Sequence, residues 1–295
     1  MAGNQVSLPN FDEWWDYNKP QETEQRFREV LPLAEESTDV AYYIELLTQI
    51  ARAQGLQGNF DQGHETLDQA RKLLDPTYQR PRVRYLLERG RLYNSSQNPD
   101  DAEPLFLEAF DVALEAGEES LAVDAAHMIA IVKPLDQKLE WNLRAMEIAE
   151  TASEEKARGW LGSLYNNIGY TYLEQKAYDS ALVYFEKLLA FCIERDDDTF
   201  AAIASWFIAK TYRLMGDSEA ALAGQLALLE QQDAAGEKSA YTYEELGECY
   251  LALGDDDNRR KFFAQAYDAF LSDPQYNFVV RYEKDRIDRL KELSE

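Results

Sequence analysis

Asp124 and His127 have the side-chain types and the spacing that acid–base chemistry needs. Residues three apart lie on one face of a helix, so the Asp124 carboxylate could orient the His127 imidazole as a general base. A second acidic set, Glu244, Glu245 and Glu248, could bind a cation or a basic ligand group. Each set also has a plainer interpretation: a local hydrogen bond for the first, and solvated carboxylates on an exposed helix for the second.

The other residues of catalytic or metal-binding type are too scattered to form a familiar site. The two histidines and two cysteines lie in four separate segments, without the spacing of a structural zinc site or a disulfide framework. The sequence contains no glycine-rich phosphate loop and no nucleophile elbow. It therefore predicts a protein without a metal or cofactor that is not an enzyme.

Composition limits the classes of partner. The chain of 295 residues carries 30 basic and 55 acidic side chains, a formal charge of −25, and its 45% hydrophobic content is enough for a folded core. Such an acidic chain would repel nucleic acid and anionic membrane surfaces. Neither an export signal nor a run of about 18 apolar residues is visible, so we expect a cytoplasmic protein that binds no membrane.

Apolar residues recur at spacings of three and four almost throughout, which is the pattern of amphipathic helices. Alternating β-branched runs are nearly absent. Prolines and acidic or glycine turns, such as Asp196–Asp198 and Gly254–Asp257, divide the pattern into helices of about 14 to 20 residues. The sequence therefore predicts an all-α protein made of antiparallel helical hairpins.

A repeated pattern of about 40 residues organises these helices. In its clearest copy a glycine, Gly169, follows Ile168 and precedes Tyr172 by three residues. Other copies place a glycine or alanine in the same small slot, which gives slots at positions 51, 90, 126, 169, 209 and 247. A small residue lets the two helices of a hairpin approach closely. The period therefore predicts about six stacked hairpins.

The small slot, the aromatic residue one turn later and the turn that follows resemble the tetratricopeptide repeat, over roughly residues 40–270. The clearest copies are also similar to bacterial tetratricopeptide proteins of unknown function. The resemblance implies a right-handed α-solenoid of about six helical hairpins with capping helices. We divide the chain into an N-terminal arm (residues 1–20), a solenoid with its N-terminal capping helix (21–275) and a C-terminal capping helix (276–295).

The same resemblance implies that the first helix of each hairpin lines a concave groove. Carried over position by position, it places a nearly neutral set of side chains there, in contrast to the acidic whole. Asn167 occupies a position at which peptide-binding members of the family hold a ligand backbone through an amide. The candidate peptide- or ligand-binding residues are Arg84, Arg91, Asp124, His127, Asn166, Asn167, Tyr170, Trp206, Phe207, Lys210, Arg213, Glu244 and Glu245.

We therefore expect a protein-interaction module that binds an extended peptide or partner segment in this groove. The asparagines would bind the peptide backbone, the aromatic residues would anchor apolar side chains, and the basic residues would bind anionic groups. The family's dicarboxylate clamp for chaperone tails is not reproduced, which disfavours a chaperone adaptor. Two alternatives stay open. One is a small-ligand sensor or undetected enzyme around Asp124, His127 and Glu244, and the other is an architectural scaffold, whose polar groove residues should prove scattered or buried.

Two adjacent tryptophans, Trp14 and Trp15, lie in the acidic N-terminal arm. Large aromatic side chains usually find burial, so the arm could fold back onto the solenoid. It could instead serve as a docking element. The sequence leaves both interpretations open.

Overall fold

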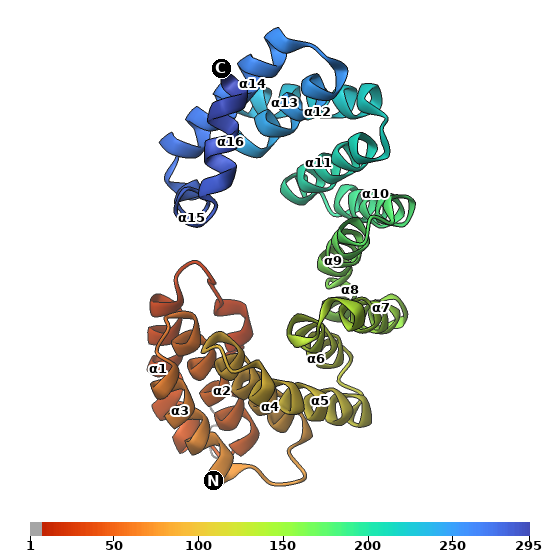
Figure 1. Ribbon diagram of the computed structural model, residues 1–295. Helices are drawn as coiled ribbons and strands as arrows, with labels where there is room; N and C mark the ends of the chain where they lie inside the picture. Colours follow the sequence, from red (N-terminus) through yellow and green to blue (C-terminus); the bar gives the residue numbers. More distant parts are fainter. Residues whose placement is uncertain (1–7) are drawn as a thin grey trace. The chain divides into compact units, whose positions relative to one another are not determined.

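The computed structural model describes residues 8–295, which form helices and connecting segments with no strand in that range. Hairpins of two antiparallel helices follow one another along the chain (Figure 1). They pair α2 (Val40–Leu56) with α3 (Phe60–Leu73), α4 (Gln79–Ser95) with α5 (Pro99–Ala116), α6 (Glu119–Val132) with α7 (Leu135–Thr151), α9 (Leu161–Glu174) with α10 (Tyr178–Glu194), α11 (Asp198–Met215) with α12 (Ser218–Ala235), and α13 (Ala240–Leu253) with α14 (Asp256–Ser272). The prediction of an all-α solenoid of helical hairpins is confirmed.

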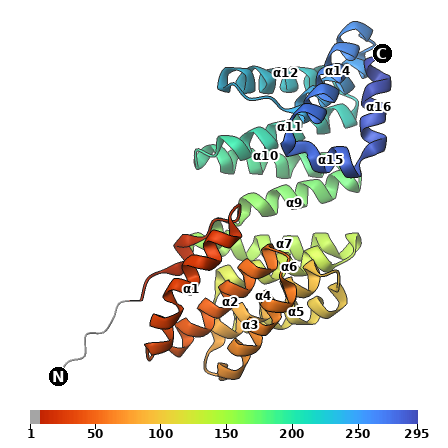
Figure 2. The same cartoon turned by 90° about the vertical axis from the view of Figure 1, so that its left-hand side faces the viewer.

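Shorter elements flank and join the hairpins. They are η1 (Phe11–Trp14), α1 (Pro20–Glu36), α8 (Glu155–Arg158), η2 (Pro274–Tyr276), α15 (Asn277–Tyr282) and α16 (Lys284–Ser294). Helix α1 packs on α2, and α16 packs on α14 (Figure 2). Phe27 of α1 and Leu290 of α16 are fully buried in these contacts, so the terminal helices cover apolar surface of the first and last hairpins.

The described chain divides into two compact units. The first unit runs to Leu164, and the second comprises Tyr165–Glu295. In the first unit the first helices of the hairpins, α2, α4 and α6, pack next to one another, and in the second α11 packs on α13. We call the surface formed by the first helices of a unit its first-helix face. Within residues 8–295, no helix combines the length and the apolar character that crossing a bilayer requires.

Local signals begin and end the helices. The carboxylates of Asp197, Asp217 and Asp255 accept hydrogen bonds from backbone N–H groups three residues on, which caps α11, α12 and α14. Gly216 and Gly254 end α11 and α13 with φ angles of 94° and 75°, a left-handed conformation that glycine adopts without strain. Each Gly-Asp pair of the sequence therefore closes one helix and opens the next.

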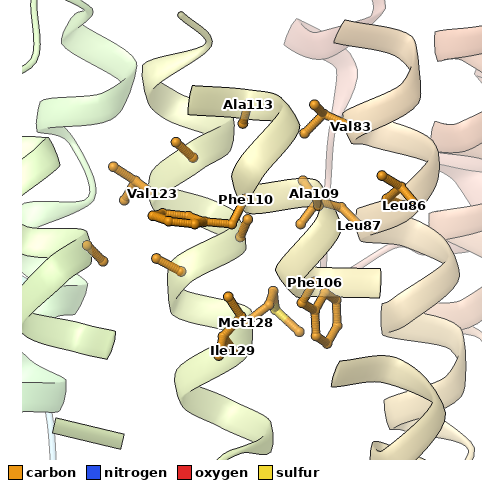
Figure 3. Packing of buried hydrophobic residues seen from close by; sticks show 14 of the residues in the cluster. Val83, Leu86, Leu87, Phe106, Ala109, Phe110, Ala113, Val123, Met128 and Ile129 are labelled. Atoms are coloured by element: carbon orange, nitrogen blue, oxygen red, sulfur yellow. The ribbon is translucent and has the colours of Figure 1, made fainter. Parts of the chain in front are cut away.

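The core of the first unit is built between consecutive hairpins. Figure 3 shows Phe106 and Phe110 of α5 between Leu87 of α4 and the α6 residues Val123 and Ile129. All five side chains are at most 1% exposed. Because α5 buries its apolar surface against the next hairpin as well as against α4, the hairpin of α4 and α5 alone would leave part of that surface in water.

The small slots are sites of close helix contact. A Cβ atom at Gly247 would lie 2.7 Å from Cδ1 of the fully buried Phe263. Gly247→Ala is therefore expected to lower the free energy of unfolding by about 1–3 kcal/mol through overpacking, despite the better helix propensity of alanine. Chemical denaturation measures the change. At the exposed Gly159 a Cβ would meet backbone oxygens at 3.4 Å or more, so a Gly159→Ala loss of equal size would contradict this explanation.

Candidate functional site

Charged side chains on the first-helix face of the first unit neutralise one another across neighbouring hairpins. Arg91 on α4 donates to Glu88 (Nη1–Oε1, 2.6 Å) and to Asp124 on α6. Arg52 on α2 lies on the other side of Glu88, with Nη1 3.1 Å from the same oxygen. Glu88 and Asp124 are 2% and 8% exposed, so this network lies largely out of water.

Burial and the charges of this network shift the pKa values of both residues of the candidate acid–base pair. Burial alone would raise the pKa of Asp124, but the charges of Arg91 and Arg52 outweigh it and hold this pKa below its usual value. Burial lowers the pKa of His127, against the opposing effect of Asp124. The His127 ring also contacts Trp160, at 5.3 Å between ring centroids. Asp124 therefore forms an ion pair with Arg91, and orienting His127 is not its only role.

The described part of the N-terminal arm before α1, residues 8–19, lies on this face, and from here on the arm means these residues. Phe11 is 5% exposed and packs edge-on against Phe27 at 6.0 Å between ring centroids. The indole Nε1 of Trp15 donates a hydrogen bond to Oε1 of Gln49 on α2, at 3.0 Å. Of the two interpretations of the tryptophan pair, the structure shows the arm folded back.

Arg84 on α4 binds a carboxylate of the arm. Its Nη1 lies 2.9 Å from Oδ1 of Asp12, and its Nη2 pairs with Oδ2, which is the bidentate geometry that a guanidinium prefers. Glu45 approaches the same guanidinium from α2, with Oε2 2.9 Å from Nε, and Arg84 is 4% exposed. Arg84, a candidate for binding anionic ligand groups, thus binds an anionic group of its own chain.

The pair between Asp12 and Arg84 makes docking of the arm dependent on pH. Burial would raise the pKa of Asp12, but the hydrogen bond and charge of Arg84 outweigh it and lower this pKa from 3.8. A carboxylate with a depressed pKa stabilises the docked arm above pH 3.8, and this contribution is lost as pH falls through the docked-state pKa. The indole N–H resonance of Trp15 should move toward its undocked position over that acidic range. Asp12→Asn should abolish this component, and a profile identical to wild type would contradict the role of Asp12.

The aromatic candidates of the second unit lie between consecutive hairpins. Phe207 stacks on the fully buried Phe185 with ring centroids 4.6 Å apart, and Tyr170 contacts the Phe207 ring at 6.2 Å. The indole Nε1 of Trp206 donates to the carbonyl oxygen of Tyr241 at 3.1 Å. Tyr170 remains 46% exposed, and Trp206 and Phe207 are half-buried. These rings therefore pack between repeats and still offer accessible surface.

The basic candidates of the second unit share one carboxylate. Arg213 Nε pairs with Oε1 of Glu245, and Lys210 Nζ lies 3.7 Å from Oε2. The same ammonium group lies 4.5 Å from the centre of the Trp206 ring, within the range of a cation–π contact. Glu245 is 2% exposed, so water screens its negative charge little. The two cations compensate this buried charge.

The rest of the acidic cluster is paired with the C-terminal helix α16. Arg286 Nε donates to both carboxylate oxygens of Glu244, at 3.0 and 3.1 Å, and Arg289 donates to Glu248. The interpretation of three solvated carboxylates is therefore wrong. Sequence reasoning missed both arginines because helical periodicity does not show which hairpin a terminal helix covers. Within residues 8–295, no three acidic, histidine or cysteine side chains are grouped as metal ligands would be.

The two asparagine candidates lie on α9. Oδ1 of Asn166 is buried and has no hydrogen-bond partner within the described part of the chain. The backbone carbonyl of Asn167 accepts a hydrogen bond from the Thr171 hydroxyl at 2.7 Å. The candidates thus fall into two groups, with Arg84, Arg91, Asp124 and His127 in the first unit, and Asn166, Asn167, Tyr170, Trp206, Phe207, Lys210, Arg213, Glu244 and Glu245 in the second.

Known proteins support the interpretation of the repeats. Residues 162–191 and 240–270 match the family described as tetratricopeptide repeat. No curated protein matches the chain in sequence.

Solved structures share the fold. A signal-transduction ATPase with a tetratricopeptide repeat sensor from Pyrococcus horikoshii is 13% identical over 92% of this chain, with a TM-score of 0.73, and the chain spans 42% of that protein. The apo form of RapI is 14% identical over 92% of this chain and 78% of its own, also with a TM-score of 0.73. NprR in complex with its cognate peptide NprX is 21% identical over 92% of this chain and 82% of its own, with a TM-score of 0.53. Together with the hairpins and the two matched repeats, these likenesses show that the chain has the fold of tetratricopeptide repeat proteins.

Proposed function

We propose that the protein is a protein-interaction module that binds an extended segment of a partner protein on its first-helix faces. The observation that carries this proposal is the arm on the first unit. There a non-repeat segment rests on α2 and α4, with the Phe11 ring in a cluster of buried apolar side chains and the Asp12 carboxylate on Arg84. The face can therefore hold a linear segment through anchors and charge-assisted hydrogen bonds.

The first-helix face of the second unit offers comparable chemistry to a partner. Tyr170 and Ile203 are 46% and 38% exposed, and the half-buried Phe207 lies one helical turn after Ile203. Asn166 has a buried side-chain carbonyl oxygen without a hydrogen-bond partner within residues 8–295, and a peptide N–H can pair with it once the surrounding side chains move aside. A purely architectural face would not need accessible aromatic rings next to an unsatisfied amide. These features favour a peptide-binding face.

The likeness to NprR, which has been solved with its cognate peptide, supports a peptide as the ligand class. The alternative of a small-ligand sensor or enzyme around Asp124, His127 and Glu244 has less support. Asp124 is held by Arg91, and Glu244 is held by Arg286, so neither carboxylate is available as a base without breaking an ion pair. We therefore assign a binding role rather than a catalytic one.

A library of linear peptides displayed on phage, selected on the full chain, tests the proposal. We expect Tyr170→Ser to weaken the selected peptides about tenfold or more, since accessible aromatic anchors dominate such interfaces. Leu226→Ser on α12 is the matched control, because Leu226 is 39% exposed but lies on a second helix. Failure to select any peptide, or equal affinity for the wild type and the Tyr170 variant, would refute binding at this face.

A further inference from the structure

The arm is held on the first unit without being part of the repeat architecture. Its regular structure is limited to the four-residue 3-10 helix η1. Its contacts with α2 and α4 are made mainly by side chains, supplemented by the Tyr42 hydroxyl, which donates to the Pro9 carbonyl oxygen at 2.8 Å. A segment attached in this way can leave without disrupting the backbone hydrogen bonds of any hairpin.

The surface beneath the arm binds two side chains as anchors. Phe11 is the hydrophobic anchor, and Trp15 is the amphipathic one. Phe11 enters an apolar cluster with Phe27, Leu46 and Ile50, all fully buried. Trp15 lies against the same cluster, with its N–H on Gln49 and the Arg52 guanidinium 5.7 Å from the ring centre. The two anchors are four residues apart, and each contacts side chains of matching chemistry.

The cations beneath the arm are paired with an acidic group of the arm, Asp12. Asp12 joins a linked set in which the other members are the cations Arg80, Arg84 and Lys156 and the carboxylates Glu45 and Glu118. Without Asp12, Arg80 and Arg84 are left with Glu45 and Glu118, and Lys156 loses the carboxylate that links it to this set. Arg84 would then lose its bidentate partner, so the site selects a ligand that supplies a carboxylate.

We propose that this surface is a binding site for a partner protein whose linear segment carries an aromatic residue, an acidic residue directly after it, and a tryptophan three residues further on. The arm, with Phe11, Asp12 and Trp15, is the tethered competitor for that segment. The inference rests on the proposed function, since it requires first-helix faces to bind extended segments. Tethering gives the arm an effective concentration in the millimolar range, so it regulates access to the site.

A labelled peptide with the sequence of residues 8–19 is the probe, titrated by fluorescence anisotropy against full-length proteins. The arm variant Phe11→Ala/Asp12→Asn/Trp15→Ala should bind this peptide at least about tenfold more tightly than the wild type, because the tethered competitor is weakened. Adding Arg84→Gln to the arm variant should reduce the affinity about tenfold or more. A peptide with Asn in place of Asp at the position of Asp12 should show a comparable loss.

Equal binding by the wild type and the arm variant, or no binding by either, would overturn the proposal. Circular dichroism establishes that the arm variant is folded, and Asp12→Asn alone should give a smaller gain in affinity if the triple change unfolds the chain. Dimers of the wild type that disappear in the arm variant would assign the surface to a second copy and also overturn it. The proposed function is tested separately, because its critical residue, Tyr170, lies in the second unit and its ligands come from an unbiased library.

Discussion

The Arg91→Ala variant is expected to lose about 3–5 kcal/mol of unfolding free energy, because it leaves Glu88 and Asp124 buried without their shared cation. Chemical denaturation at neutral pH measures this loss. In the wild type, the depressed pKa of Asp124 means that its contribution is present above pH 3.8 and is lost as pH falls through the folded-state pKa. The difference between wild type and variant should therefore shrink in acid, where the Asp124 carboxylate becomes neutral.

Arg82 on the same helix provides the control for this prediction. Its ion pair with Glu108 is at the surface, with 44% of each side chain exposed. Such pairs contribute about 0–1 kcal/mol, so Arg82→Ala should leave stability nearly unchanged. Equal losses for the Arg82 and Arg91 variants, or a deficit at Arg91 that does not depend on pH, would contradict the buried network.

Phe185→Ala should lower the stability of the second unit by about 3–5 kcal/mol, since it opens a cavity at a fully buried position. The Phe185 ring fills the space left by Gly169 and stacks on Phe207, so the variant removes support from the first-helix face as well. Denaturation followed by circular dichroism measures the loss. Val183 on the same helix is 50% exposed, and Val183→Ala should change stability by less than about 0.5 kcal/mol. A similar loss at both positions would contradict this packing.

The fold could be predicted because its determinants are local and repeat along the chain. A small residue such as Gly169 or Gly247 is needed where a phenylalanine of the second helix crosses the first, and this contact recurs in three hairpins, with Gly90 and Phe106 as the third pair. Gly-Asp pairs such as Gly216-Asp217 mark where one helix ends and the next begins. Periodicity, small slots and turn chemistry all favour the same architecture, so agreement among them identified it.

The candidate site could be predicted only in part, because its charges pair between hairpins. Arg213 and Glu245 are 32 residues apart, Arg91 and Asp124 are 33 apart, and the separation of Arg52 from Glu88 is 36. Each separation is close to one repeat, but helical spacing alone does not say which side chains of neighbouring helices meet. A nearly neutral groove in an acidic chain was the visible sign of this pairing. Arginines counted as free for a ligand were instead bound by carboxylates of the same chain.

The position of the arm could not be predicted from the sequence for a different reason. The aromatic side chains of the tryptophans indicated that they could be buried. The repeat pattern does not include the arm, so it does not predict which helices the arm contacts. The pair of Asp12 with Arg84 joins residues 72 apart and depends on the finished arrangement of α2 and α4. Such a contact becomes visible only once the hairpins are assembled.

Hydrogen–deuterium exchange of the full chain, with and without a selected peptide, tests most directly whether first-helix faces bind linear segments. Exchange reports local opening, which a bound segment suppresses where it contacts the protein. The account predicts slower exchange in α9 and α11 on peptide binding, with little change in the second helices α10, α12 and α14. Protection concentrated in those second helices, with α9 and α11 unchanged, would contradict it.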